Sequence, residues 1–324
     1  MSEADMPVMS GKLEVVVSAR TDEADGIASF ELKAADGSAL PPFDAGAHID
    51  VHLPGPMIRQ YSLCNPPGEQ HRYLIAVLRE PDGRGGSARM HDVKAGDRLT
   101  ISAPRNAFAL DAGREPKLLV AGGIGITPLK AMAHALAARG IDFELHYFAR
   151  SASRAAFRSA LAAEPFAPDV HFHFDDAGAG LPLPDETLAP DRFAHVYLCG
   201  PSGFIDKVRD QAIARGFAIE RIHVEHFSAG SAASGGQSFV VEAVRSGVTV
   251  TVGENESIAQ ALERAGVQVL TSCERGLCGA CLTPVLEGIP EHRDEYQTDA
   301  EKAENAKMTI CCSRARTPML RLDI

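Results

Sequence analysis

The first 112 residues contain short runs in which apolar and polar positions alternate. Six such runs rich in β-branched and aromatic residues follow one another: LEVVVSAR, IASFELKA, AHIDVHL, RQYSL, RYLIAVLRE and DRLTISAP. Segments rich in Gly, Pro and Asp separate them, among them ADG, PPFDAG, PDGRGG and KAGD. Short strands at this spacing predict an antiparallel β-barrel or sandwich over residues 1–112.

The pattern changes near residue 113, where apolar strands begin to alternate with helices. KLLVAGG is a fully apolar strand, and PLKAMAHALAARG after it has apolar residues at helical spacing and a closing glycine. Three further strands (FELHYFAR, VHFHFDD and HVYLCG), two further helices (RAAFRSALAAE and FIDKVRDQAIARG) and a last strand (IHVEHF) complete the region. This alternation predicts a parallel α/β sheet over residues 113–227.

A third region follows a segment of small polar residues. Residues 228–237, SAGSAASGGQ, have the composition of a flexible linker. SFVVEAVRSG and VTVTVGE then predict a hairpin, SIAQALERAG predicts a short helix, and a cysteine-rich loop comes next. We therefore expect three domains, with the last one over residues 238–324.

Composition narrows the class of protein. The net charge of the 324 residues is −11, which argues against nucleic acid as a partner, because phosphates require clustered Lys and Arg. The acidic balance fits solubility, and a basic protein partner stays open. No signal peptide or apolar run of about 18 residues is visible, so we expect a cytoplasmic protein without a membrane segment. Cytosolic thiols stay reduced, and five of the seven cysteines follow residue 270, which points to a metal site.

The cysteine spacing in the last region has a specific meaning. Cys273, Cys278 and Cys281 are spaced C-x4-C-x2-C, and Cys311 follows after 29 further residues. This is the plant-type pattern that holds a [2Fe–2S] cluster. Three thiolates must converge from one loop, and we expect Gly276 and Gly279 to permit its tight fold.

Two alternatives accompany this interpretation. Four cysteines also hold zinc, but zinc usually takes paired C-x2-C units and only one is present here, which favours iron–sulfur. Cys312 competes with Cys311 as fourth ligand; neighbours on a strand point to opposite faces, so we expect only one of the two to face the cluster. We expect Cys64 to be a small core residue.

A glycine turn joins KLLV to the helix that follows it. The turn runs from Gly122 to Pro128, with Thr127 as the expected N-cap and Pro128 as the first helical residue. Such glycines let phosphates approach backbone N–H groups at a helix N-terminus, although they also serve as plain strand-to-helix corners. Pro128 stands where a G-x-G-x-x-G fingerprint has its third glycine, so the motif is incomplete.

The recognition of a ribose stays open. The strand FELHYFAR ends in Arg150 rather than in the acidic residue that binds a ribose hydroxyl. Arg150 or Arg154 would favour a 2′-phosphate, or both are solvated surface residues. Cys199 and Gly200 end another apolar strand, where ligands bind in open α/β sheets; Cys199 either lines that pocket or is a buried structural thiol.

Two motifs in the β-rich region suit a flavin nucleotide. Arg59, Tyr61 and Leu63 alternate on one strand face, so that Arg can hold a phosphate or flavin edge and Tyr can stack on a ring, while Ser62 can donate a hydrogen bond. The segment GRGGS around Arg84 suits a phosphate-binding backbone nest. Each motif is weak by itself, since R-x-Y-S occurs by chance and GRGG is often only a loop.

The order of the motifs is more specific than any one of them. RQYSL, GRGGS, GGIGITP, CGP and CERGLCGAC…CC span nearly the whole chain, and in this order the chain resembles the phthalate dioxygenase reductase family. The resemblance implies an antiparallel β-barrel flavin domain, an α/β parallel-sheet NAD domain of the ferredoxin-reductase type and a C-terminal β-grasp [2Fe–2S] ferredoxin domain.

The resemblance also implies residue roles, with FMN rather than FAD as the flavin. Arg59, Tyr61 and Ser62 contact the flavin; Arg84, Gly86 and Ser87 surround its phosphate; Gly123, Gly125 and Thr127 serve the NADH phosphates; Cys199 and Gly200 lie near the nicotinamide; and Cys273, Cys278, Cys281 and Cys311 hold the cluster. Phe227 shields the isoalloxazine ring or makes a plain hydrophobic contact at the linker. The missing acidic ribose partner leaves NADH against NADPH undecided.

The implied chemistry is electron transfer without a catalytic acid–base pair. NADH gives up a hydride and the cluster takes one electron at a time, so a flavin is needed between them. The resemblance implies that the acceptor is the Rieske-type oxygenase component of an aromatic-degrading system. Two alternatives remain: a stand-alone flavin and iron–sulfur reductase with small-molecule acceptors, and a zinc-stapled nucleotide-binding regulator.

Overall fold

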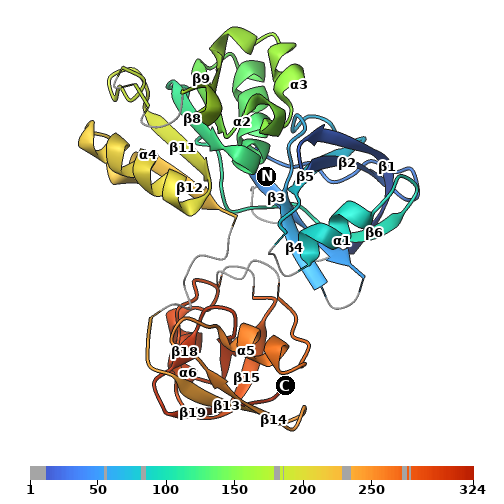
Figure 1. Cartoon of the computed structure of the whole chain (residues 1–324), viewed down its shortest axis with the longest axis vertical. Coiled ribbons are helices and arrows are strands. Elements are labelled where there is room, and N and C mark those ends of the chain that lie inside the picture. The colour runs from blue at the N-terminus through green and yellow to red at the C-terminus, as the bar shows by residue number, and fades with distance from the viewer. Residues whose placement is uncertain are drawn as a thin grey trace, which may run out of the picture. The chain divides into compact units, whose positions relative to one another are not determined.

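The structure, a computed structural model, describes residues 12–54, 57–81, 85–178, 183–184, 186–227, 235–271, 276 and 279–324. The described residues within 1–51 and 61–228 form one compact unit, and those within 52–60 and 229–324 form a second (Figure 1). None of the helices among these residues is both long and apolar enough to cross a membrane.

The first sheet is antiparallel and closes on itself. Its strands are β1 (Lys12–Ala24), β2 (Ile27–Ala34), β3 (Ala47–Leu53), β4 (Met57–Ser62), β5 (Tyr73–Leu78), β6 (Arg98–Ser102) and β7 (Arg105–Asn106), in the order β4-β3-β6-β1-β2-β5 with β7 beside β3. Directly after β4, the N–H of Leu63 donates to the carbonyl of Ala47 at 2.9 Å and that of Cys64 to Leu74 at 2.9 Å. These bonds link the segment at the end of β4 to β3 and to β5, and so complete the predicted barrel.

Alternation along these strands fills the barrel interior. Val15 and Val17 of β1 are fully buried, as are Phe30 and Leu32 of β2. Cys64 is also buried, and its thiol donates to the carbonyl of Leu74 at 3.2 Å. Burial raises the pKa of this thiol to about 12, as expected for a core cysteine. One short helix, α1 (Gly86–Asp92), connects β5 to β6.

The second sheet is parallel. Its strands are β8 (Lys117–Gly122), β9 (Phe143–Ala149), β10 (Val170–Phe174), β11 (His195–Gly200) and β12 (Ile222–His226), in the order β10-β9-β8-β11-β12. Helix α2 (Ile126–Ala138) lies on one face and α4 (Ser202–Ala214) on the other (Figure 1). Because neighbouring residues point to opposite faces, Leu119 packs toward α2 and Leu118 toward α4. The predicted α/β region is therefore confirmed.

One predicted helix is much shorter than expected. RAAFRSALAAE was expected to be helical throughout, yet helix α3 covers only Arg158–Ala162. Phe157 has a left-handed backbone with φ of 59°, and Ala155 is extended. This conformation interrupts the helical path and buries Ala156 and Phe157 in the core. Burial of these side chains thus prevails over local helix propensity.

The third sheet belongs to the second unit. Its strands are β13 (Phe239–Ala243), β14 (Val248–Val252), β15 (Leu282–Glu287), β17 (Lys307–Thr309) and β19 (Met319–Leu322), in the order β14-β13-β19-β15-β17. Two short strands, β16 (Pro290–Glu291) and β18 (Arg314–Ala315), form a ribbon beside it. The predicted hairpin is the β13–β14 pair. Helices α5 (Ile258–Arg264) and α6 (Asp299–Glu304) both begin with a capping box.

A buried arginine organises the core of this unit. Arg314 is only 1% exposed, and its guanidinium donates to the carbonyls of Glu256 at 2.8 Å, Gln237 at 3.1 Å and Gly253 at 2.9 Å. Its central carbon lies 5.1 Å from the centre of the Phe239 ring. One planar cation thereby satisfies three carbonyls from two separate segments.

We expect Arg314→Met to lower the free energy of unfolding by about 2–4 kcal/mol, because it removes a buried guanidinium that donates to three part-buried carbonyls. Urea unfolding followed by circular dichroism measures this loss. Arg316→Met is the matched control, since Arg316 is exposed and lies two residues away. Equal unfolding midpoints for the two variants would contradict the assigned role of Arg314.

Candidate functional site

Two motifs that are far apart in the sequence meet at the carboxyl end of the parallel sheet. From β8 the chain continues to β9 and β10 on one side of the sheet, and then to β11 and β12 on the other side. The strand order therefore reverses between β8 and β11, and ligands bind at such a point in open α/β sheets. A Cβ on Gly125 would lie 2.2 Å from the carbonyl oxygen of Cys199. Likewise, a Cβ on Gly200 would lie 3.0 Å from the Cα of Gly122. The glycine turn and the Cys199–Gly200 segment are therefore in direct backbone contact.

The same junction leaves one side open. A Cβ on Gly122 would lie 2.8 Å from the ring of Phe204, so that side is filled by α4. Gly123 differs, because its φ is +55° and no heavy atom lies within 4 Å of the position its Cβ would take. The turn thus presents bare backbone to open space in front of α2. This arrangement fits the approach of a dinucleotide's phosphates.

Thr127 does not cap the helix as predicted. A short 3₁₀ turn over Gly123–Gly125 runs directly into α2, so the chain is already helical at Ile126 and the N-cap is Gly125. Thr127 lies inside the first turn and its hydroxyl donates to the carbonyl of Ile124 at 3.1 Å. The Thr127 side chain is only 2% exposed, so this hydrogen bond stabilises the turn in the protein interior. Its backbone N–H still belongs to the helix N-terminus.

A buried carboxylate next to Cys199 was missed by the sequence analysis. Glu225 of β12 is 6% exposed and is the strand partner of Cys199, which is fully buried. The hydroxyl of Ser62 donates to Glu225 Oε2 at 3.5 Å, so a predicted flavin contact reaches the strand beside a predicted nicotinamide contact. The sequence did contain a signal for this residue, since Glu225 is an acidic residue inside the apolar strand IHVEHF. Acidic side chains are seldom buried unless they are paired, so such a position suggests a functional role.

Three further predicted flavin contacts lie on β4 and directly after β12 (Ile222–His226). Arg59 and Tyr61 are half-buried on β4, and the Arg59 guanidinium donates to the carbonyl of Ile58 at 2.8 Å. Phe227 follows β12 directly and is 41% exposed, which leaves its ring accessible.

The predicted phosphate nest is in part the start of a helix. Gly86 and Ser87 are the first residues of α1, after Gly85 in the left-handed conformation with φ of 80°. The hydroxyl of Ser87 accepts from the backbone N–H of Glu80 at 3.0 Å, which holds the two ends of the loop together. Arg84 lies outside the described residues.

Two of the four predicted cluster ligands can be located, since Cys273 and Cys278 lie outside the described residues. Cys281 and Cys311 are 5% and 6% exposed. Their thiols interact, and Cys281, Cys312 and burial together raise the pKa of the Cys311 thiol. The hydrogen bond from Cys311 in turn lowers the pKa of the Cys312 thiol to about 7, because a donating thiol stabilises its thiolate. Buried sulfur atoms this close together suit a cation that takes thiolate ligands. The Cys281–Cys311 pair thus fits a [2Fe–2S] cluster.

The last two cysteines do not lie on a strand, so the prediction that they point to opposite faces is wrong. Cys311 and Cys312 lie in a turn after β17, where the N–H groups of Cys312 and Ser313 both point to the carbonyl of Thr309. Both thiols are consequently buried on the inner side. Cys312 differs in its neighbours, because its sulfur lies 3.2 Å from the hydroxyl of Thr309.

Gly276 and Gly279 of the predicted cysteine loop lie in close contact with other parts of the unit. Gly276 has a φ of +76°, and a Cβ there would lie 2.6 Å from the sulfur of Cys312. Gly279 has a φ of +70°, and a Cβ there would lie 2.3 Å from the ring of Tyr296. These two positions require glycine because of these close contacts and their left-handed backbone.

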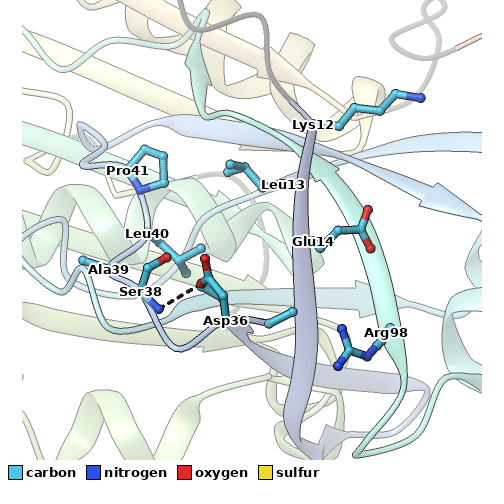
Figure 2. Close-up of a pocket in the computed structure, with 11 residues that line it drawn as sticks. Lys12, Leu13, Glu14, Asp36, Ser38, Ala39, Leu40, Pro41 and Arg98 are labelled. Carbon is cyan, nitrogen blue, oxygen red and sulfur yellow. Dashed lines mark hydrogen bonds between the residues drawn. The ribbon is translucent and has the colours of Figure 1, made fainter.

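The barrel also carries a hollow that is separate from the predicted sites. Figure 2 shows the lining side chains. This hollow has a volume of about 430 Å³ and is lined by residues of β1, the end of β2 and the segment after it, and Arg98. Its charged groups are of both signs, with Lys12 and Arg98 against Glu14 and Asp36, and Asp36 already accepts from the N–H of Ser38 at 2.9 Å. None of the predicted site residues lines it.

Comparisons with known proteins agree with this geometry. Residues 241–316 match the family described as the 2Fe-2S iron-sulfur cluster binding domain. The chain is 48% identical over 316 residues to the vanillate O-demethylase oxidoreductase of a Pseudomonas species, covering 96% of this chain and 100% of that protein. It is 38% identical over 330 residues to the phthalate dioxygenase reductase of Burkholderia cepacia, covering 98% and 99%.

A solved structure gives the same result. It is described as phthalate dioxygenase reductase, a modular structure for electron transfer from pyridine nucleotides to [2Fe-2S]. The TM-score is 0.73 at 37% identity, with 99% of this chain and 100% of that chain covered. Flavin, pyridine nucleotide and [2Fe–2S] cluster are thus the cofactors of this oxidoreductase, and the chain belongs to the phthalate dioxygenase reductase family.

Proposed function

We propose that this chain is the reductase component of a Rieske-type aromatic oxygenase or O-demethylase, and that it carries electrons from NADH through FMN and a [2Fe–2S] cluster to that oxygenase. Several relatives support this, since their names belong to vanillate, phenoxybenzoate and toluene-4-sulfonate systems. The first of these favours a methoxylated aromatic acid as the oxygenase substrate. We place the protein in the cytoplasm, where NADH and reduced thiols are available.

The observation that carries the proposal is the junction of Ser62, Glu225 and Cys199. Ser62 comes from the strand with the expected flavin contacts, and Cys199 ends the strand with the expected nicotinamide contact. Glu225 lies between them, as hydrogen-bond acceptor of the first and strand partner of the second. A flavin and a nicotinamide held by these residues would face each other, as hydride transfer requires.

The residues around this junction would bind and orient the two rings. A bound flavin supplies the chemistry that converts a hydride into single electrons. The Ser62–Glu225 hydrogen bond fixes the direction of the hydroxyl, and the burial of both side chains keeps water from the reacting face. The backbone at Gly123 and Gly125 would receive the phosphates, while the positive charge of Arg59 suits a flavin or its phosphate.

The choice between NADH and NADPH depends on the end of β9. This strand ends at Ala149, and Arg150 after it is exposed, as is Arg154. Because both arginines are exposed, neither belongs to a buried pocket that could hold a 2′-phosphate. This supports a preference for NADH over NADPH. A ratio of kcat/KM for NADH over NADPH above 1 is the expected result, and a ratio below 1 would assign a 2′-phosphate contact to these arginines.

We expect the purified protein to show flavin and [2Fe–2S] absorbance that NADH bleaches, and to support turnover of a vanillate-type oxygenase. Electron delivery to the oxygenase should be faster than to a dye, because the cluster domain would serve a protein partner. A panel of methoxylated and carboxylated aromatics identifies the substrate. Faster reduction of the dye would instead favour a stand-alone reductase.

We expect Gly125→Ala to slow flavin reduction by NADH at least 100-fold, because its Cβ would push the glycine turn away from Cys199. Stopped-flow absorbance measures this rate. Gly203→Ala is the matched control, since no heavy atom lies within 4 Å of its Cβ position in α4. Flavin and iron contents should be unchanged in both variants, and equal rates would show that the junction does not matter.

We expect Cys311→Ser to lose the cluster and Cys312→Ser to keep it, because Cys311 interacts with Cys281 while Cys312 contacts Thr309 and the Gly276 segment. Iron analysis should fall from about two irons per chain toward zero in the first variant only. NADH should still reduce the flavin there, while electron delivery stops. Cys278→Ser should behave like Cys311→Ser; the reverse pattern at positions 311 and 312 would assign Cys312 as ligand.

A further inference from the structure

Three histidines and a glutamate gather on one face of the parallel sheet, apart from the cofactor sites described above. Glu144 and His146 are two residues apart on β9 and therefore share a face. His171 on β10 is the strand partner of His146, and His173 is the partner of Phe148. Paired residues of a parallel sheet point the same way, so all four side chains lie on one face.

The donor atoms of three of these residues converge. Nε2 of His146 lies 3.2 Å from Glu144 Oε2, and Nε2 of His171 lies 4.0 Å from Glu144 Oε1. One donor atom from each of Glu144, His146 and His171 lies within 4.8 Å of the other two. A tetrahedral zinc ion with bonds of about 2.0–2.1 Å needs ligand atoms about 3.3–3.4 Å apart. Small side-chain rotations would bring the three atoms to that spacing.

We propose that Glu144, His146 and His171 form a binding site for a divalent transition-metal ion of the zinc type, with solvent as the fourth ligand. Two imidazoles and a carboxylate are ligands that zinc prefers. The His171 side chain is 42% exposed whereas that of His146 is 6% exposed, so the site has a buried floor and an open entrance.

A hydrogen bond with His173 would orient His146 as a metal ligand. Its Nε2 lies 2.9 Å from Nδ1 of His146, at hydrogen-bond distance. When His146 donates from Nδ1, its Nε2 carries a free lone pair directed at Glu144. Two acceptors 3.2 Å apart repel each other unless a proton or a cation lies between them. Such a second hydrogen bond is the usual way in which a ligating histidine is oriented.

Packing holds these rings in position. The ring of His173 stacks on Phe148 with centroids 4.2 Å apart and planes inclined by 10°, and on His146 at 5.1 Å and 15°. The ring of His171 also stacks on that of His146, with centroids 4.7 Å apart. A site held by stacked rings loses little side-chain entropy when it takes an ion. The ion would also tie the edge strand β10 to β9.

Arg192 competes with the ion. Its guanidinium donates to Glu144 Oε1, and its side chain is 56% exposed. An exposed ion pair of this kind contributes little to stability, so the arginine can move aside when a divalent cation arrives. Arg192 therefore neutralises Glu144 without the ion and weakens the apparent affinity.

A second histidine pair in the same sheet provides a matched control. Nδ1 of His195 lies 2.9 Å from Nε2 of His223, as in the His146–His173 pair. The nearby carboxylate of Asp111 lies 3.6 Å from Nε2 of His195 but also 3.2 Å from the ammonium group of the fully buried Lys117. That fixed positive charge opposes a cation, so we expect no zinc at His195 and His223.

The test is zinc binding to the holoprotein, measured by competition with a chelating indicator dye while iron content is monitored. We expect one zinc per chain in the wild type, an at least tenfold weaker affinity in His171→Ala, a tighter one in Arg192→Ala and an unchanged one in His223→Ala. His171 is exposed enough that its variant should fold. Zinc should also raise the melting temperature of the wild type but not of His171→Ala.

X-ray absorption at the zinc edge identifies the ligands. Nitrogen and oxygen at about 2.0–2.1 Å are expected, whereas zinc bound by the cysteines of the cluster domain would show sulfur at about 2.3 Å. A sulfur shell, no binding by the wild type, or equal affinity in the wild type and His171→Ala would each overturn the proposal.

Discussion

The backbone contact between Gly125 and the Cys199–Gly200 segment is the constraint on which the proposed pyridine-nucleotide site depends. The turn after β8 begins helix α2, and the end of β11 begins α4, so both helices start from one junction. A side chain at Gly125 would have no room, because a Cβ would lie 2.2 Å from a carbonyl oxygen. Glycine therefore lets two helix N-termini and two strand ends approach one ligand.

This junction also determines where the flavin and the nucleotide would meet. Glu225 is the strand partner of Cys199, and the hydroxyl of Ser62 reaches it from the barrel side. A buried carboxylate with a hydroxyl donor is a costly arrangement unless it serves a purpose. In the proposed site, Glu225 beside the end of β11 would orient the hydroxyl of Ser62 toward the reacting face.

The second unit depends on close approaches of a different kind. Gly276 lies against Cys312 and Gly279 lies against Tyr296, so neither position has room for a side chain. Arg314 satisfies three carbonyls in the interior of the same unit. A bound cluster would thus be supported by the packing at Gly276 and Gly279 in addition to its ligands.

Local pattern was sufficient for most of the secondary structure and for the iron–sulfur cluster, whereas the flavin and NADH were inferred from the order of the motifs along the chain. Alternation predicted the barrel strands, fully apolar runs predicted the parallel strands, and C-x4-C-x2-C indicated the [2Fe–2S] cluster. It failed where long-range packing overrides local preference. Phe157 interrupts a predicted helix in order to bury its ring, and a 3₁₀ turn moves the start of α2 ahead of Thr127.

The sequence by itself determined the class of chemistry, because cysteine and glycine spacings are properties of neighbouring residues. Only the tertiary structure decided which distant residues share a site. Glu225 gains its meaning from Ser62, 163 positions away, and His171 gains its meaning from pairing with His146 on the next strand. Such contacts depend on strand order and register, which packing of the whole sheet selects and which no short stretch of sequence contains.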